Sequence, residues 1–352
     1  MAHSTRRSFV TSLMTRSPRT LAVAAAAVLL VIAVAGLSIG SHRGSPTPSA
    51  PATLAFGKLP AAILSPPDGI GAVGDATALG IPYYGPAKLS WSGQPSKAMA
   101  TAPVERLTPP TPPDLDAFAS RLGGTLTNAR PWARFYQLPG DFNIVINLDD
   151  PTSLEPTFVI SRLSAGTPAV KPISSDVARA AADTFLRTRG LTPTWDNAVR
   201  VTTYSSRSLT VFYVLYQREI VVGTSRVPEV DRSGSPKGIQ LQVDSGGQVV
   251  SVDGVVRLAV QSAAYGLRPP ASAVADAIAL PPVMSADQFP PLSPTPTVAL
   301  TTEQLVYIAV AAGDGEVYLE PAYLFTGTFT QGGTAFEKRV LTPALVPSAI
   351  KS

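Results

Sequence analysis

The stretch that most strongly indicates a fold is SDVARAAADTFLRTRG, residues 175–190. Ser175 can cap a helix, Arg187 and Arg189 suit the negative end of the helix dipole, and Gly190 is a typical helix stop. The apolar residues recur three and four positions apart, which is typical of an amphipathic helix; they are Ala178, Ala181, Ala182, Phe185 and Leu186. The stretch therefore predicts a helix with one buried face.

Runs of β-branched and aromatic residues follow this helix and predict strands. The expected strands are 198–204, 209–217, 220–227, 239–243, 249–252 and 255–260. The polar break at Gln217-Arg218-Glu219 and the turn at Ser245-Gly246-Gly247 are interpreted as hairpin connections.

The same order, a helix and then strands, precedes and follows this segment. Upstream, Leu115, Phe118, Ala119 and Leu122 form a helical stripe that ends at Gly123-Gly124. Strands are expected there at 133–137, 142–147 and 157–163, and a weaker third round has a helix at 272–280 with strands at 304–311, 316–326 and 336–341. This predicts an α+β fold with units at 114–170, 171–268 and 269–345. Residues 54–113 are expected to be loop-rich, with short strands around 87–91 and 102–107.

The N-terminal region predicts a membrane anchor. Leu21–Ile39 is uncharged and apolar and would span about 28 Å as a helix, close to the thickness of a bilayer core. Arg6, Arg7, Arg16 and Arg19 precede it, so residues 1–19 are expected in the cytoplasm, 20–40 across the membrane and 41–53 as a Ser/Pro-rich stalk. The alternative is a cleaved secretory signal, with small residues at Ala33, Ala35 and Gly36 near a cleavage site.

Charge argues against nucleic-acid binding. The net charge is +4, but five of the 28 basic residues and none of the 24 acidic residues precede position 45. The remainder has 23 basic and 24 acidic side chains, a net charge of −1, so it lacks the basic surface that phosphate backbones require. The chain has no cysteine, which excludes disulfides.

Several forms of catalysis are excluded by composition. The two histidines are His3 and His42, so the outer region cannot form a Ser-His-Asp triad, a Cys-His pair or an ordinary zinc site. A Ser-x-x-Lys pair occurs at Ser348 and Lys351, close to the chain end, where fraying is expected. The carboxylates near turns that could be mistaken for catalytic groups are Asp149, Asp150, Asp244, Asp253, Asp314 and Glu316. No catalytic, cofactor-binding or metal-binding residue is predicted.

Aromatic residues recur along the expected strands and could form a groove for a peptide or glycan, although core packing is the simpler interpretation. They are Tyr204, Phe212, Tyr213, Tyr216, Tyr307, Tyr318, Tyr323 and Phe325.

The helix at 175–190, the paired strands after it and the hairpin sequence VDSGGQV at 243–249 resemble PepSY-type domains. The segment LEPAYLFTG at 319–327 resembles the closing strand of PepSY-like units in YycI/YycH-type membrane-anchored regulators. The resemblance covers about residues 114–345 and implies PepSY-like units, each a helix packed on antiparallel strands, that bind and restrain a protein partner without catalytic residues.

The resulting expectation is a membrane-anchored, extracytoplasmic binding or regulatory protein that is not an enzyme. Its expected partners are the membrane, through residues 21–39, and an envelope protein or peptide. The alternatives are a carboxylate-dependent envelope hydrolase, which needs two carboxyl groups about 5–9.5 Å apart, and a passive carrier with an apolar pocket.

Overall fold

The computed structural model describes residues 54–352 except 63, 65–80, 149–153, 165–172, 206–209, 280–291, 314 and 352. The predicted cytoplasmic tail, membrane span and stalk lie outside these residues, as do Asp149, Asp150 and Asp314. In the part that the structure describes, none of the helices has the length and apolar character needed to cross a membrane.

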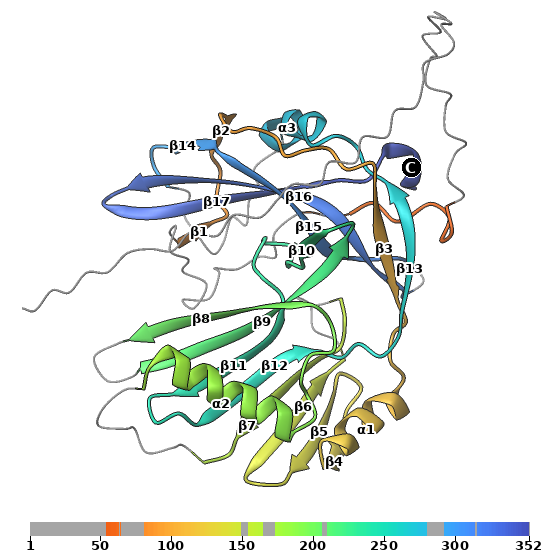
Figure 1. Cartoon of the computed structure of the whole chain (residues 1–352), viewed down its shortest axis with the longest axis vertical. Coiled ribbons are helices and arrows are strands. Elements are labelled where there is room, and N and C mark those ends of the chain that lie inside the picture. Colours follow the sequence, from red (N-terminus) through yellow and green to blue (C-terminus); the bar gives the residue numbers. More distant parts are fainter. Residues whose placement is uncertain are drawn as a thin grey trace, which may run out of the picture. The chain divides into compact units, whose positions relative to one another are not determined.

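A nine-stranded antiparallel sheet dominates the lower part of Figure 1. Its strands are β4 (Thr125–Ala129), β5 (Ala133–Leu138), β6 (Phe142–Asn147), β7 (Thr157–Arg162), β8 (Asn197–Ser205), β9 (Thr210–Val222), β10 (Ser225–Pro228), β11 (Gly238–Asp244) and β12 (Val249–Val255). The order is β10-β9-β11-β12-β7-β6-β5-β4, and β8 pairs with β9. Central strands such as β6 and β11 bury every second residue, so one face of the sheet is apolar.

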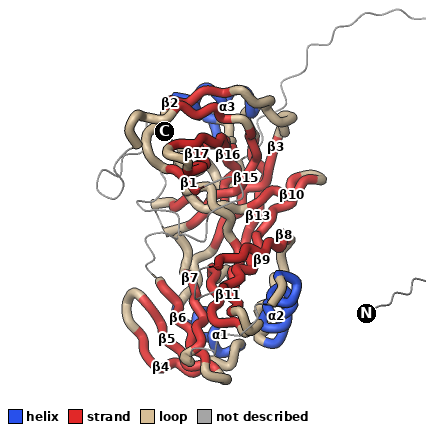
Figure 2. The backbone as a smooth tube through the Cα atoms, turned by 90° about the vertical axis from the view of Figure 1, so that its left-hand side faces the viewer, coloured by secondary structure: helices blue, strands red, loops and turns tan. Residues whose placement is uncertain are grey.

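Two helices, α1 (Pro112–Arg121) and α2 (Ser175–Thr188), cover that apolar face (Figures 1 and 2). Thr111 caps α1, and Asp114 accepts a hydrogen bond from the Thr111 backbone N–H. Ser174, one residue before the predicted cap, accepts from the Val177 backbone N–H at 3.4 Å and begins α2. The helix starts therefore follow ordinary capping chemistry.

The core beneath the helices is one continuous cluster. Ala119 of α1 and Ala182 of α2 are completely buried. Their small side chains let both helices approach the sheet closely. The Phe118 ring lies 5.4 Å from the Phe158 ring, and the Phe185 ring lies 5.4 Å from the Phe142 ring. Both phenylalanines thus face inward, as the helical stripes predict.

A second sheet has six strands and a separate core. It contains β1 (Ile81–Tyr83), β3 (Thr101–Leu107), β13 (Val260–Gly266), β15 (Thr302–Ala311), β16 (Val317–Gln331) and β17 (Thr334–Pro343). The order is β1-β17-β16-β3-β13, with β15 on the other edge of β16. The helix α3 (Pro270–Ala279), the short parallel pair β2 (Lys88–Trp91) and β14 (Thr297–Leu300), and a 3-10 turn at Pro347–Ala349 complete this part.

The strand β9 connects the two cores. Its first part pairs with β8 and β11, whereas Glu219–Val222 pair with β10. Ile220 and Val222 then pack in the core of the six-stranded sheet, and Glu229, just after β10, forms an isolated bridge with Tyr307 of β15. Polar side chains of β9 are therefore held where the two sheets meet.

The predicted fold class, an α+β chain with an N-terminal transmembrane helix followed by PepSY-like units, is wrong. The described residues are mostly β, with 52% in strands and 15% in helices. Strands are more numerous and longer than expected, because several continue through residues whose polar sequence is typical of a turn between strands. In residues 54–113, expected to be loop-rich, the short strands expected at 87–91 and 102–107 are confirmed as β2 and β3, and β1 is additional. The hairpin connection expected at residues 217–219 is instead an uninterrupted part of β9.

Candidate ligand-binding site

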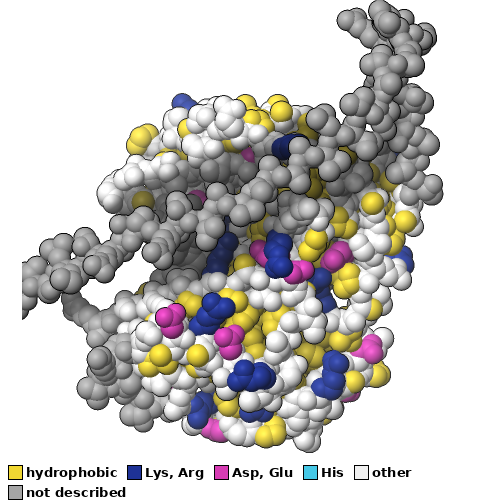
Figure 3. Space-filling view, viewed as in Figure 1, with side chains coloured by type: hydrophobic (Ala, Val, Ile, Leu, Met, Phe, Trp, Pro, Cys, Tyr) yellow, Lys and Arg dark blue, Asp and Glu magenta, His cyan; other side chains and the backbone are white. Residues whose placement is uncertain are grey.

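A cavity of about 380 Å³ lies on the apolar face of the nine-stranded sheet, between α1 and the segment that follows α2. Figure 3 shows hydrophobic side chains on this face with charged side chains around them. The cavity is lined by Phe118, Arg121, Leu122, Phe158, Gly190, Leu191, Thr192, Thr194, Trp195, Arg218, Glu229, Gly238, Ile239, Val255, Arg257 and Leu258.

Two glycines allow the chain to form this cavity. Gly190 has a φ of +66°, a left-handed conformation that favours glycine, and it turns the chain after α2 so that Leu191 is buried at the cavity wall. Gly238 allows the backbone of β9 to approach, because a Cβ atom there would lie 1.9 Å from the Tyr216 carbonyl oxygen. The cavity therefore depends on local backbone geometry as well as on side-chain size.

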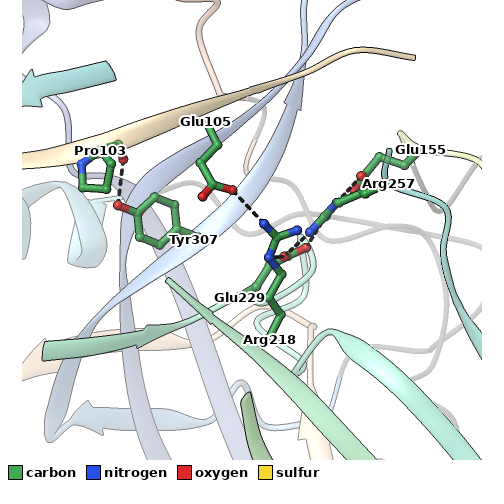
Figure 4. A network of polar contacts seen from close by, with 7 residues as sticks. All are labelled: Pro103, Glu105, Glu155, Arg218, Glu229, Arg257 and Tyr307. Carbon is green, nitrogen blue, oxygen red and sulfur yellow. Dashed lines mark hydrogen bonds and ion pairs between the residues drawn. The ribbon is translucent and has the colours of Figure 1, made fainter. Parts of the chain in front are cut away.

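One end of the cavity is an ionic cluster at the junction of the sheets (Figure 4). Arg257 Nη1 and Nη2 each donate to a Glu229 carboxylate oxygen at 2.6 Å, and Arg257 Nε and Nη2 also donate to Glu155. The three side chains are 9% or less exposed. Arg257 is thus held by four charge-assisted hydrogen bonds, the strong class of protein hydrogen bond.

Arg218 is less completely satisfied than Arg257. Its Nη2 donates to Glu105 Oε2 at 2.9 Å, whereas its Nε lies 3.9 Å from Glu229 Oε2, too far for a hydrogen bond. The guanidinium carbon lies 5.8 Å from the centre of the Trp195 ring. Within the described residues, Arg218 Nε and Trp195 Nε1 are buried donors without hydrogen-bond partners. Each such buried donor costs about 1–3 kcal/mol, so Arg218 and Trp195 are less well satisfied than Arg257.

The charges of the cluster affect one another. Burial raises the pKa of Glu229, but the charge and hydrogen bonds of Arg257 outweigh this, so its pKa is lowered. Burial raises the pKa of Glu105, against the opposing charge of Arg218. Burial and the nearby Arg257 charge lower the pKa of Arg218. Glu229 is therefore held as a carboxylate, whereas charge on Glu105 and Arg218 is less favourable than in water.

A second cavity, of about 330 Å³, shares this cluster. Glu155 and Arg257 line it together with Leu107, Leu154 and the proline-rich segment before α1. Arg257 thus lines both cavities, and Glu229 lines the first.

Comparison with known proteins identifies no family. No family model matches the chain. No curated protein matches it either. Among solved structures, the chain is similar to an uncharacterized protein from Eubacterium rectale ATCC 33656, with 7% identity, a TM-score of 0.38, and coverage of 75% of this chain and 90% of the other. This similarity is too weak to carry an argument about fold or function.

Of the carboxylates singled out in the sequence, the structure describes Asp244, Asp253 and Glu316, and it places them on different elements. Asp244 accepts hydrogen bonds at 2.9 Å from the Gly246 and Gln248 backbone N–H groups, which confirms its role in a turn. Asp253 was expected at a hairpin end, but it lies within β12 opposite Gln240, where burial raises its pKa to about 6. Glu316 accepts from the Tyr318 hydroxyl at 2.6 Å and pairs with Arg106 at 3.4 Å.

The Ser-x-x-Lys pair lies on the surface. Ser348 and Lys351 are both exposed. The chain end does not show the expected fraying, because Leu59 donates to the Ala349 carbonyl at 2.8 Å and accepts from the Lys351 backbone N–H at 2.7 Å.

Most of the aromatic residues form core, which confirms the simpler interpretation. Six of the eight are buried: Phe212, Tyr216, Tyr307, Tyr318, Tyr323 and Phe325. Tyr204 is 38% exposed on β8, and Tyr213 is half-buried. The described residues therefore provide no aromatic groove along these strands.

The residues of the ionic cluster were not predicted as a site. The sequence does carry a signal, since Arg218, Glu229 and Arg257 each interrupt an apolar run, in YQREIVV, RVPEVD and VVRLAV. A charged residue inside a strand pattern normally indicates a turn or an exposed position. The charged partners of these residues are remote in the sequence, so the ion pairs could not be inferred from residue spacing.

Proposed function

We propose that this chain is an extracytoplasmic binding protein that holds a small, mainly apolar ligand in the cavity beside α1. The observation that carries this proposal is a cavity whose walls are mainly apolar and whose lining includes the charged side chains Arg218, Glu229 and Arg257 at one end. Its volume of about 380 Å³ is within the range of about 300–1,000 Å³ that is usual for ligand pockets. Apolar walls with a few polar groups at one end are also usual for such pockets.

The chemistry of the cavity favours binding over hydrolysis. Glu229 is the carboxylate that lines this cavity, and it accepts two hydrogen bonds from Arg257. A general acid needs a raised pKa, whereas the pKa of Glu229 is lowered. Glu229 is thus occupied by Arg257, and this supports the binding role over the envelope-hydrolase alternative.

A regulatory role follows if ligand occupancy is transmitted to a partner. The polar end of the cavity belongs to the same ionic cluster that joins β9 to β3, so a ligand at that end would alter contacts between the two sheets. An envelope protein or peptide could respond to this change, whereas a passive carrier would bind its ligand without a partner. Co-purification with and without ligand would separate these two roles.

The binding proposal is tested by titrating the purified full-length chain with the neutral fluorescent probe N-phenyl-1-naphthylamine. Leu258→Trp places a bulky ring at the cavity wall, and Ile278→Trp on α3 is the matched control, since both side chains are 41% exposed. We expect Leu258→Trp to weaken probe binding at least tenfold and Ile278→Trp to leave it unchanged. Equal binding by both variants would exclude this cavity as the site.

The proposed location rests on residues 21–39, which lie outside the described part of the chain. Full-length protein should stay with the membrane fraction after an alkaline wash, and external protease should digest the region after residue 45. Release by alkali, together with a mature N-terminus near residue 37, would instead show a cleaved signal.

A further inference from the structure

We infer that the ligand is an anionic single-chain amphiphile, with its apolar chain in the cavity and its carboxylate, sulfate or phosphate head group in an adjoining hollow lined by arginines. This inference rests on the proposed binding function and names the chemical class of the ligand. It follows from the position of the hollow, its charge and the contacts of its arginines.

The hollow lies at the C-terminal ends of α1 and α2. Its volume is about 640 Å³, and it is lined by Arg121, Leu122, Pro139, Gly140, Arg187, Thr188, Arg189 and Gly190. Three of these residues, Arg121, Leu122 and Gly190, also line the cavity, so the two spaces adjoin. One ligand can therefore contact both.

The charged side chains that line the hollow are all arginines. Arg121 and Arg187 are exposed, and Arg189 is half-buried. In the part of the chain that the structure describes, none of the three forms an ion pair with a carboxylate. Asp141 lies outside the lining, and its carboxylate accepts a hydrogen bond from Ser164 Oγ. The hollow therefore presents positive charge that no acidic side chain neutralises.

Helix dipoles alone do not account for three arginines. Arg121 ends α1, Arg187 lies in the last turn of α2, and basic residues are usual there because each helix end carries about half a negative charge. The two helix ends together contribute about one negative charge. The three arginines contribute three positive charges, so a positive excess remains for an anion.

The arginines also keep donors available. Arg187 Nη2 donates to Thr184 Oγ1 at 3.2 Å, and Arg189 Nη2 donates to the Pro139 carbonyl at 2.7 Å. A guanidinium has five N–H donors, so most of them remain. Guanidinium groups bind carboxylate and phosphate oxygens through paired hydrogen bonds, which matches an anionic head group better than a hydroxyl.

Arg121 connects the charge of the hollow to the apolar wall of the cavity. Its guanidinium carbon lies 6.0 Å from the centre of the Phe118 ring, and Phe118 lines the cavity. Leu122, Phe158 and Ile239 of the same wall are at most 6% exposed. Each methylene buried against such a wall contributes about fourfold in affinity. An alkyl or acyl chain in the cavity can thus place its charged end beside Arg121.

The ionic cluster at the junction of the sheets is a poorer place for the anion. It contains three carboxylates, Glu105, Glu155 and Glu229, against the two guanidiniums of Arg218 and Arg257. An anion there would add a fourth negative charge where water screens charge poorly. The head group is therefore assigned to the hollow and not to the cluster.

The test is a calorimetric titration of the purified full-length chain in nonionic detergent with decanoate, decanol and decyltrimethylammonium. These probes share chain length and differ in head-group charge, and titrations into protein-free micelles are subtracted. An exposed ion pair contributes up to about fivefold in affinity, so several around one head group should make decanoate bind at least tenfold more tightly than decyltrimethylammonium. Decanoate should also displace N-phenyl-1-naphthylamine, because both occupy the cavity.

The arginines are tested with the double variant Arg121→Gln/Arg187→Gln, which should reduce the preference for decanoate over decanol about tenfold. The double variant Arg130→Gln/Arg200→Gln is the matched control. Both of its arginines are exposed, lie outside the linings of the cavity and the hollow, and form no ion pair within the described residues. It removes the same charge and should leave the preference unchanged.

Two further variants keep the test decisive if the first is poorly folded. Arg121→Lys/Arg187→Lys keeps the charge and should retain most of the preference. Arg187→Gln alone, at a side chain that lines the hollow and not the cavity, should reduce the preference about two- to fivefold.

The inference would be overturned if the native chain bound decanol or decyltrimethylammonium as tightly as decanoate. An unchanged preference in the glutamine variants, or decanoate binding that leaves the fluorescent probe in place, would also overturn it. If N-phenyl-1-naphthylamine binds in the cavity but decanoate does not bind, the ligand class is wrong and the proposed binding function still stands. If neither compound binds, both proposals fail.

Discussion

Arg218 of β9 donates a hydrogen bond from Nη2 to Glu105 of β3 at 2.9 Å, and this contact joins the nine-stranded sheet to the six-stranded sheet. The two residues are 113 positions apart in the sequence, and their side chains are 11% and 15% exposed. The neighbouring pairs of Arg257 with Glu155 and Glu229 are even more buried. The contact between the two sheets therefore depends on a small group of buried charges, and the proposed ligand cavity borders the same group.

Removing one member of the buried cluster should be costly. Glu229→Gln keeps the shape of the side chain but leaves Arg257 with a weaker partner, and we expect a loss of about 3–5 kcal/mol in the free energy of unfolding. Asp196→Asn is the control, since its partner Arg226 is 57% exposed and Asp196 is 40% exposed; it should cost at most about 1 kcal/mol. Urea unfolding measures both, and equal small losses would contradict the role assigned to Glu229.

Glu320 should make stability fall as the pH rises toward 8. Burial raises its pKa to about 8 from an ordinary value of 4.5. Between pH 4.5 and about 8, the folded state keeps a proton on Glu320 that the unfolded state has released. The free energy of unfolding therefore decreases as the pH rises through this range.

The effect of Glu320 can be isolated by comparison with Glu320→Gln. Between pH 6.5 and 8, the native chain should lose about 1.5 kcal/mol relative to the variant. Asp253, whose pKa burial raises to about 6, is present in both proteins and does not enter this difference. Lys338, whose pKa burial lowers to about 8, is present in both proteins and cancels in the difference. Parallel pH dependences for the two proteins would show that Glu320 is ionised throughout this range.

Gly238→Ala should disturb the contact between β9 and β11. The added Cβ would lie 1.9 Å from the Tyr216 carbonyl oxygen, so one strand must shift, at a cost of about 1–3 kcal/mol. Gly313→Ala is the control, because a Cβ there meets no atom within 4 Å. Thermal unfolding should show a clear decrease in Tm for Gly238→Ala and little change for Gly313→Ala.

Ala182→Leu should test how closely α2 approaches the sheet. Ala182 is completely buried, so the larger side chain has no free space and should destabilise the chain by about 1–3 kcal/mol. Ala180→Leu, at an exposed position of the same helix, should change stability by at most about 0.5 kcal/mol. A neutral Ala182→Leu would show that α2 packs more loosely than the structure indicates.

The helices were largely predictable because their signals are local. The apolar stripes of α1 and α2 and the glycines after them appear directly in the sequence, and their observed bounds differ from the predicted ones by a few residues. Several strands were also located, including β6 and β15. Apolar periodicity and capping depend on residues within one or two turns, so the sequence contains this information.

Strand continuity was less predictable. The polar residues Gln217-Arg218-Glu219 resemble a hairpin break, yet β9 passes through them and reaches the second core. Their charges are tolerated inside the molecule because Arg218 finds Glu105 on a distant strand. The resulting excess of strand is the main reason that the predicted fold class was wrong.

The amino-acid sequence alone determined where the two sheet-covering helices form, which catalytic groups the chain lacks and how its charge is distributed. Only the tertiary structure decided that β9 continues, that five charged residues from separate segments form one buried cluster, and that a mainly apolar cavity lies beside it. The physical reason is that burial and ion pairing depend on which distant segments meet, whereas helix formation depends on neighbours along the chain.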